Sequence, residues 1–121
     1  MFMWFVIGFI VLIFLFKFLL SSNISLKDAK VKLNSGAFLV DVRSKEEFDC
    51  DHLENTINIP HDEIQKITNI VKDKNKSVLL YCLSGMRAAS ACSEMRRMGY
   101  KDVSNVGSYS RAARLADSII N

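Results

Sequence analysis

A cysteine stands where an apolar segment meets a short loop that contains a glycine. Cys82 follows the strand-like run Val78–Tyr81, and the loop Leu83–Met86 leads to Arg87 and a stretch of helix-forming residues. A strand, a tight loop and a helix in this order direct backbone N–H groups and the positive end of the helix dipole at one point. A cysteine at that point favours its thiolate form, which is the nucleophilic form. The same arrangement can cradle an anion.

The alternative for any free cysteine is a small, inert, buried side chain. For Cys82 the neighbouring glycine, arginine and helix start favour a reactive thiol. Cys92 falls on a helix of small residues and is expected to pack against the sheet. Cys50 could act as a resolving thiol, and the sequence leaves that role open. The cysteine spacing is not that of a zinc site and no histidine cluster accompanies it, so we expect no metal.

The length and charge of the chain exclude several classes of protein. With 121 residues there is room for one small domain. The 16 Lys and Arg residues exceed the 13 Asp and Glu residues by only three, and no basic stripe alternates with aromatic residues. We therefore expect no nucleic-acid partner. Three cysteines, an odd number, argue against a full disulfide framework and fit a reducing compartment or one free working thiol.

Residues 1–20 are almost wholly apolar, with Lys17 as the only charge. About 20 apolar residues in a helix cross a bilayer, which predicts one transmembrane helix that contacts the membrane through residues 2–20, and then a linker at 21–25. A cleaved signal peptide is the alternative, but no basic residue precedes the apolar segment and Leu19–Ser22 is a weak cleavage site. Basic residues follow the span, which predicts a single-pass protein with a cytoplasmic domain; a periplasmic or other extracytoplasmic domain is the alternative.

Residues 26–121 form the predicted domain, in which strand-like and helical segments alternate. Strands are predicted at 37–42, 56–59, 77–81 and 103–106, and helices at 26–33, from 44, and at 61–71, 88–98 and 110–120. This alternation predicts an α/β domain with a mainly parallel sheet. Sites in such sheets form at the carboxyl ends of strands, and the Cys82 loop follows one of them.

Five motifs of the chain resemble those of the single-domain rhodaneses in order and spacing. They are Asp41-Val42-Arg43, Glu47-Phe48, His52-Leu53, Ile57-Asn58-Ile59-Pro60 and Tyr81-Cys82-Leu83-Ser84-Gly85-Met86-Arg87-Ala88. The resemblance covers nearly all residues after 25 and implies a three-layer α/β sandwich around a mostly parallel sheet. The activity it implies is sulfurtransfer, in which Cys82 accepts sulfane sulfur from a donor such as thiosulfate and passes it to cyanide or a thiol. No metal or organic cofactor is implied.

The resemblance also implies roles for the residues of the loop. Cys82 is the expected nucleophile and sulfur carrier, and Arg87 is expected to orient the anionic donor and help to keep the thiol deprotonated. Backbone N–H groups would surround the donor and the persulfide; they belong to Leu83, Ser84, Gly85, Met86 and Arg87. The alternative role for Arg87 is that of a helix-start residue bound to a neighbouring carboxylate.

The other motif residues are expected to be structural. Asp41, at a strand end, should accept hydrogen bonds from backbone N–H groups. Arg43 could line the pocket mouth, but an ion pair with Glu46 or Glu47 is favoured. His52 is expected to bond local backbone rather than to act as a base, because a base must reach the nucleophile.

The chain departs from the family at two places. Members often carry glycines where Asp51 and Asn55 stand here, although asparagine tolerates a left-handed conformation. Near the C-terminus, members often show two glycines followed by a tryptophan, whereas here residues 106–109 contain one glycine, Gly107, and residues 111–114 contain no tryptophan. Because of this departure, the sequence does not predict how the last helix packs or what shape the pocket wall has.

Two further functions are alternatives to sulfurtransfer. One is a docking module in a sulfur relay with little turnover of its own. The other is a thiol-based phosphatase or arsenate reductase. Cys82 and Arg87 enclose four residues, whereas the resemblance gives those related enzymes a loop with five. The shorter loop encloses a smaller cavity, which suits one added sulfur atom and disfavours a tetrahedral oxyanion.

Overall fold

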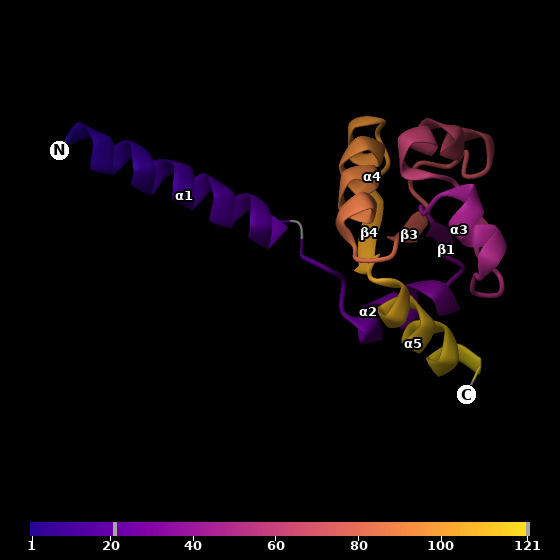
Figure 1. The fold of residues 1–121 in the computed structure, drawn as a ribbon. Coiled ribbons are helices and arrows are strands. Elements are labelled where there is room, and N and C mark those ends of the chain that lie inside the picture. The colour runs from indigo at the N-terminus through magenta and orange to yellow at the C-terminus, as the bar shows by residue number, and fades with distance from the viewer. Residues whose placement is uncertain (21, 121) are drawn as a thin grey trace.

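The computed structural model describes residues 1–20 and 22–120, with the backbone alone at 17–20 and 120. The start of the predicted linker, Ser21, and the side chain of Lys17 lie outside this description. The elements are shown in Figure 1, and in chain order they are α1 (Phe2–Leu20), α2 (Leu26–Asn34), β1 (Phe38–Asp41), α3 (Lys45–Cys50), β2 (Ile57–Asn58), the 3₁₀ segment η1 (His61–Asn69), β3 (Ser77–Tyr81), α4 (Met86–Arg97), β4 (Asp102–Gly107) and α5 (Tyr109–Ile120).

The four strands form one parallel sheet in the order β2-β1-β3-β4, so the predicted parallel α/β architecture is confirmed. β3 lies inside the sheet, between β1 and β4. A bulge interrupts its pairing with β4: Leu80 pairs with Asn105, whereas Tyr81 pairs with Gly107. β4 therefore contributes one extra residue, Val106, just before the carboxyl edge.

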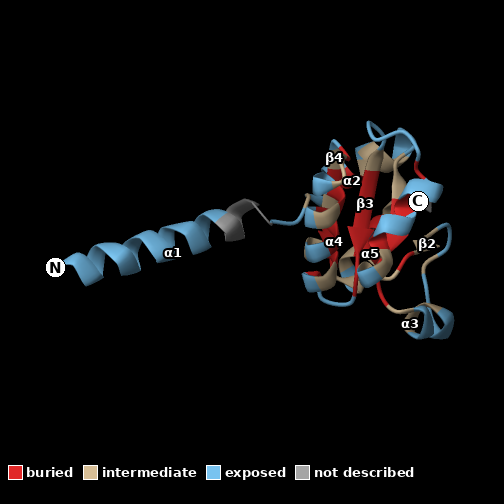
Figure 2. Cartoon of the chain, turned by 90° about the horizontal axis from the view of Figure 1, so that it is seen from above, coloured by how far each residue is buried: buried red, intermediate tan, exposed pale blue. Residues whose placement is uncertain are grey.

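Helices cover both faces of the sheet and give the expected three layers. Val78 and Leu80 of β3 face one apolar core, which α4 and η1 complete. Leu79 and Tyr81 face a second core, which α2 and α5 complete. Figure 2 shows β3 buried along its length between these layers. Burial on both faces explains why β3 is a continuous apolar run rather than an alternating one.

Local sequence determines most of the helix starts. Ser25 accepts a hydrogen bond from the backbone N–H of Asp28 and caps α2, as predicted. Ser44 and Glu47 form the predicted capping box of α3. The helix predicted over 61–71 is instead a kinked 3₁₀ segment, with non-helical backbone angles at Glu63. Spacings of three residues fit both helix types, which is why the pattern alone did not separate them.

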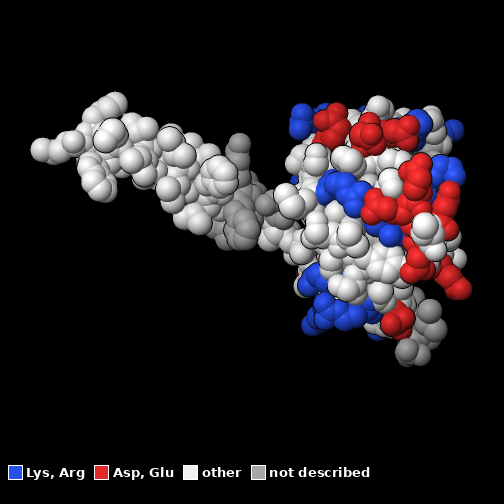
Figure 3. Space-filling view, viewed as in Figure 1, with Lys and Arg blue, Asp and Glu red and all other residues white. Residues whose placement is uncertain are grey.

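α1 lies apart from the sheet and its covering helices (Figures 1 and 2), and its described side chains are exposed and uncharged (Figure 3). The prediction of a transmembrane helix over residues 1–20 is wrong. Across the residues described, the structure contains no helix with the combined length and apolar character that a membrane crossing requires. The predictions of a single-pass localisation and a cytoplasmic orientation, which depended on that helix, are corrected with it. The predicted membrane contact through residues 2–20 is not shown.

The layered packing predicts that both faces of β3 contribute to stability. Leu79→Ala and Leu80→Ala each remove a buried side chain from a different core, so each should lower the free energy of unfolding by about 2–5 kcal/mol. Urea unfolding of the full chain measures this. Val31→Ala is the control, because Val31 is 59% exposed and should change stability by less than about 0.5 kcal/mol. A small effect from either leucine variant would contradict burial on both faces.

Candidate active site

Cys82 lies at the carboxyl end of β3, with its sulfur directed into the loop that follows. The Cys82 Sγ accepts hydrogen bonds from the backbone N–H groups of Gly85, at 2.9 Å, and Ala88, at 3.4 Å. Gly85 is the N-cap of α4, so the positive end of that helix dipole lies at the sulfur. Cys82 itself is fully buried. Such groups can stabilise negative charge on the buried sulfur.

Of the five loop N–H groups that the sequence suggested, Gly85 is the one bonded to the sulfur in this structure. The second donor, Ala88, lies one residue beyond the predicted set. It belongs to the first turn of α4, whose leading N–H groups have no partner within the helix. The N–H of Ala88 could have been predicted as a donor by counting the first turn of α4 together with the loop.

The loop is held against the end of β4 and the start of α5. The N–H of Cys82 donates to the Gly107 carbonyl oxygen at 3.2 Å, and the N–H of Tyr109 donates to the Leu83 carbonyl oxygen at 3.2 Å. Gly85 has a φ of 102°, and a Cβ atom there would lie 3.2 Å from the Gly107 Cα. Both the left-handed backbone and the close approach favour glycine at position 85.

Asn105 braces the same loop, and the sequence analysis did not select it. Its Nδ2 donates to the Gly85 carbonyl oxygen at 3.0 Å, and its Oδ1 accepts from the N–H of Gly107 at 2.8 Å. The residue is 6% exposed. The sequence gives little sign of this role, because Asp102 and Ser104 of the same strand are polar too, and it is the burial of the amide that makes hydrogen-bond partners necessary.

Arg87 forms a two-pronged ion pair with Glu47 of α3. Arg87 Nη1 donates to Glu47 Oε1 at 2.6 Å, and Nη2 donates to Oε2 at 3.1 Å. The bonds from Arg87 are the main cause that lowers the pKa of Glu47 to about 2, and the bond from the N–H of Ser44 acts in the same direction. The pKa of Arg87 is raised, first by its hydrogen bonds to Glu47.

The alternative role for Arg87, binding a carboxylate, is therefore what the structure shows. It is compatible with a role at the sulfur, because Arg87 lies in the first turn of α4, the helix whose leading N–H groups bond the sulfur. Glu47 was not among the predicted site residues. The two partners are 40 positions apart, and their meeting depends on the adjacency of β1 and β3, which the sequence did not specify.

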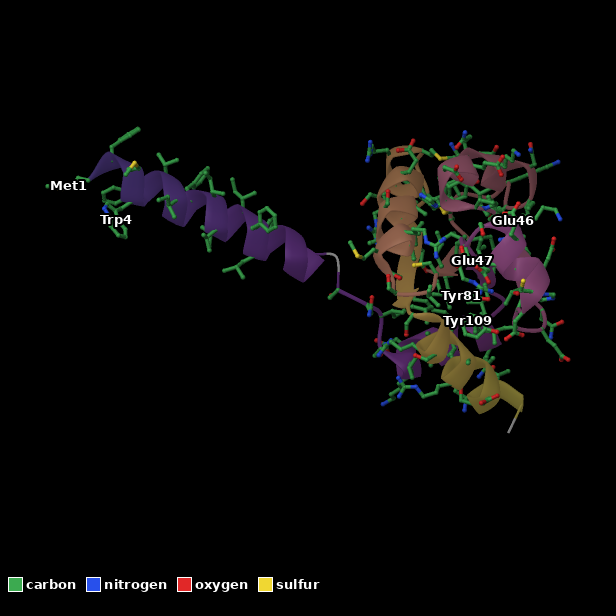
Figure 4. All side chains as sticks on the ribbon, in the orientation of Figure 1. Met1, Trp4, Glu46, Glu47, Tyr81 and Tyr109 are labelled. Carbon is green, nitrogen blue, oxygen red and sulfur yellow. The ribbon has the colours of Figure 1, made fainter. Side chains whose placement is uncertain are left out.

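Asp41 and Arg43 form a second ion pair, which is buried. Asp41 Oδ1 accepts from the backbone N–H of Arg43 at 2.9 Å, as the prediction for Asp41 required, and Oδ2 accepts from Arg43 Nη2 at 2.8 Å. Arg43 Nη2 also donates to the Asp51 carbonyl oxygen at 2.7 Å. The Arg43 guanidinium lies 4.6 Å from the centre of the Tyr109 ring. Tyr109 in turn contacts Tyr81, with ring centres 6.0 Å apart (Figure 4).

The predicted pairing of Arg43 with Glu46 or Glu47 is wrong. Arg43 is only 6% exposed and turns toward the buried Asp41 carboxylate, since a buried guanidinium requires a partner at the same depth. Glu47 is occupied by Arg87.

The remaining predicted residues lie away from the sulfur or in structural roles. His52 Nδ1 donates to the Phe48 carbonyl oxygen at 2.8 Å, and the two rings stack with centres 3.9 Å apart, so the expected local bonding of this ring is confirmed. Cys92 is buried, as expected, and burial is the main cause that raises the pKa of its thiol to about 12. Cys50 is exposed at the end of α3. Among the described residues, no group of three His, Cys, Asp or Glu side chains is placed to hold a metal ion.

The last helix packs without the family's second glycine and tryptophan. Ala112 and Leu115 of α5 are buried in the core shared with α2. Arg111 Nε donates to the Val106 carbonyl oxygen at 2.8 Å, and its Nη2 donates to the Ile24 carbonyl oxygen at 2.7 Å. Asn55 has a φ of 60°, the left-handed conformation that the sequence suggested for it.

The chain is similar to known proteins over most of its length. The profile of the Rhodanese-like domain matches residues 25–112. The chain belongs to the rhodanese-like domain family. Among curated relatives of this rhodanese-like chain, thiosulfate sulfurtransferase PspE of Escherichia coli strain K12 is 38% identical over 69 residues, which is 56% of this chain and 66% of PspE. The chain spans about a quarter of the length of other relatives, the tRNA uridine(34) hydroxylases of several bacteria.

Two solved structures show the same fold as this rhodanese-like domain. A rhodanese with anions from E. coli superposes with a TM-score of 0.60 and 34% identity, over 63% of this chain and 91% of that chain. The human single-domain sulfurtransferase TSTD1 superposes with a TM-score of 0.64 and 25% identity, over 76% of this chain and 95% of that chain. The family to which the chain belongs therefore includes relatives named as sulfurtransferases and as a sulfur carrier.

The buried pair predicts a large effect from neutralising Asp41. Asp41→Asn keeps the shape of the side chain but leaves the Arg43 charge buried without a counterion, so the free energy of unfolding should fall by about 3 kcal/mol. Urea unfolding measures the loss. Glu63→Gln breaks the exposed pair with Lys66 and, as a matched control, should change stability by less than about 1 kcal/mol. Equal effects of the two variants would show that burial does not govern the Asp41 pair.

The Glu47–Arg87 pair predicts a pH dependence of stability. Folding lowers the pKa of Glu47 from 4.5 to about 2, so its stabilising contribution is complete above pH 4.5 and is lost as the pH falls toward 2. Glu47→Gln should be less stable than the unmodified chain by about 1 kcal/mol at neutral pH, the size of a partly exposed pair. The gap should close as the pH approaches 2. Chemical unfolding at a series of pH values measures it, and a gap independent of pH would contradict the pairing.

Proposed function

We propose that this chain transfers sulfane sulfur from a small anionic donor such as thiosulfate to a thiophilic acceptor, cyanide or a thiol, through a persulfide on Cys82. The observation that carries the proposal is the placement of the Cys82 sulfur at the start of α4, with two backbone N–H groups directed at it. This arrangement stabilises the anionic sulfur both before and after it accepts a second sulfur atom.

The first step is attack of the Cys82 thiolate on the outer sulfur of the donor. A bond forms between Sγ and that sulfur, the donor's S–S bond breaks, and sulfite leaves with the electron pair. In the second step the acceptor attacks the outer sulfur of the persulfide. With cyanide the products are thiocyanate and the Cys82 thiolate, so the site returns to its starting state with no net oxidation or reduction of the protein.

Arg87 has the proposed role of orienting the donor. Its guanidinium has five N–H donors, and two of them bind Glu47. The rest are available to donor oxygens while Glu47 fixes the plane of the group. The name of PspE, thiosulfate sulfurtransferase, supports this donor class by similarity. The loop of four residues between Cys82 and Arg87 favours sulfurtransfer over phosphate or arsenate chemistry.

A docking module in a sulfur relay is the second candidate. The similarity to a sulfur carrier relative, over 69% of this chain and 46% of that protein, favours it over functions unrelated to sulfur. A module that only docked a partner would not require N–H groups directed at a buried thiol, and for this reason the catalytic role is preferred.

The test is thiosulfate:cyanide sulfurtransfer by the full chain, with intact mass recorded after exposure to thiosulfate. We expect thiocyanate production and a mass gain of one sulfur atom, both absent from Cys82→Ser. Cys50→Ser and Cys92→Ala are the matched controls, because neither thiol has N–H donors of the kind found at Cys82, and both should retain the two signals. A folded chain with no mass gain and no thiocyanate would reject the thiosulfate reaction and favour the docking role.

A further inference from the structure

The loop around the buried nucleophile presents two exposed apolar side chains. Leu83 is 59% exposed and Met86 is 79% exposed, whereas Cys82 between them and the sheet is fully buried. Outside α1, the described side chains include five large exposed apolar ones: Val31, Ile70, Leu83, Met86 and Ile119. Two of the five therefore belong to one loop of four residues. Single exposed apolar side chains are ordinary, but a pair beside a nucleophile requires an explanation.

This exposure is not the result of a loosely held loop. The Leu83 carbonyl oxygen accepts from the N–H of Tyr109, and the Gly85 carbonyl oxygen accepts from Asn105. Met86 opens α4, so its backbone is fixed by the helix. The backbone that carries the two side chains is thus already ordered. A ligand that contacts them therefore loses little binding free energy to ordering of the loop.

Charge at the loop does not distinguish one acceptor thiolate from another. Arg87 is the basic residue of the loop, and Glu47 compensates its charge through two hydrogen bonds. A persulfide on Cys82 would itself be anionic, and its outer sulfur would lie about 2 Å beyond Sγ. Since the sulfur is covered by the loop, an incoming acceptor has to approach past loop side chains. Apolar contact, rather than ionic attraction, is what those side chains offer.

On the basis of the proposed persulfide function, we propose that Leu83 and Met86 are specificity residues for the acceptor, and that they favour a small organic thiol whose sulfur is attached to an apolar group. The acceptor reacts as its thiolate. A bond forms between the acceptor sulfur and the outer sulfur of the persulfide, and the Sγ–S bond breaks. The electron pair returns to Sγ, and the products are the acceptor's persulfide anion and the Cys82 thiolate. Burial of the apolar group against Leu83 and Met86 accelerates this step.

The experiment compares two thiols of similar acidity, benzyl mercaptan and 2-mercaptoethanol, on the full chain after it is loaded with thiosulfate. Loss of the added sulfur is followed by intact mass, and rates are expressed per loaded molecule. We expect benzyl mercaptan to react at least tenfold faster. The double variant Leu83→Asn with Met86→Gln keeps side-chain size but removes apolar character, and should bring this ratio of rates close to one. Val31→Thr, altered at an equally exposed apolar residue on α2, should keep the ratio of the unmodified chain.

The outcomes separate this inference from the function on which it rests. Equal rates for the two thiols in the unmodified chain, or a ratio that the double variant does not change, would overturn the specificity role while the persulfide function stands. A change of the same size in Val31→Thr would also overturn it. Failure of Cys82 to gain sulfur would overturn both proposals at once.

Discussion

The geometry at Cys82 depends on one close contact, between the backbones of Gly85 and Gly107. The first glycine begins α4 and the second ends β4, and a Cβ atom on Gly85 would lie 3.2 Å from the Cα of Gly107. This contact allows the N–H of Cys82 to reach the Gly107 carbonyl oxygen and Asn105 to reach the Gly85 carbonyl oxygen. The direction of the N–H groups toward the sulfur follows from the path that these bonds impose on the loop. The environment of the Cys82 sulfur is therefore made mostly by backbone groups.

Two ion pairs then connect the loop to the rest of the carboxyl edge. Asp41 and Arg43 form the deeper pair, at the end of β1. Arg43 also donates to the Asp51 carbonyl oxygen and lies over the ring of Tyr109 in α5. Glu47 and Arg87 form the shallower pair, about one-third exposed. The deeper pair is part of the fold, because breaking it leaves a buried charge. The shallower pair costs less to break, and it connects α3 to the first turn of α4.

Most of the fold could be predicted because the signals for it are local. Ser25 and Ser44 mark helix starts by their own side-chain bonds, and the run ending at Tyr81 shows its two-sided burial by being continuously apolar. The Cys82 loop was recognised for the same reason. The wrong predictions concern contacts that depend on how deeply a side chain is buried or on which distant segments of the chain are neighbours. The partner of Arg43 depended on how deeply its guanidinium is buried, and the role of Glu47 depended on which strands are neighbours.

The helix predicted to span a membrane was a different kind of error. The almost wholly apolar composition of residues 1–20 led to that prediction, whereas among the residues that the structure describes no helix meets the requirements of a membrane crossing. Asn105 shows the opposite case. It is one of three polar residues in β4 and carries little weight in the sequence, yet its two hydrogen bonds brace both sides of the glycine contact.

The bulge in β4 has a consequence for how the chain can change. Because Leu80 pairs with Asn105 and Tyr81 pairs with Gly107, the site depends on the number of residues in β4 as well as on their identity. Side chains on a strand alternate between its two faces, so a deletion of one residue there would reverse the faces of those that follow. Asn105 and Gly107 would no longer meet the loop together. Evolution can therefore exchange side chains around this sulfur more readily than it can change the spacing of the strand beside it.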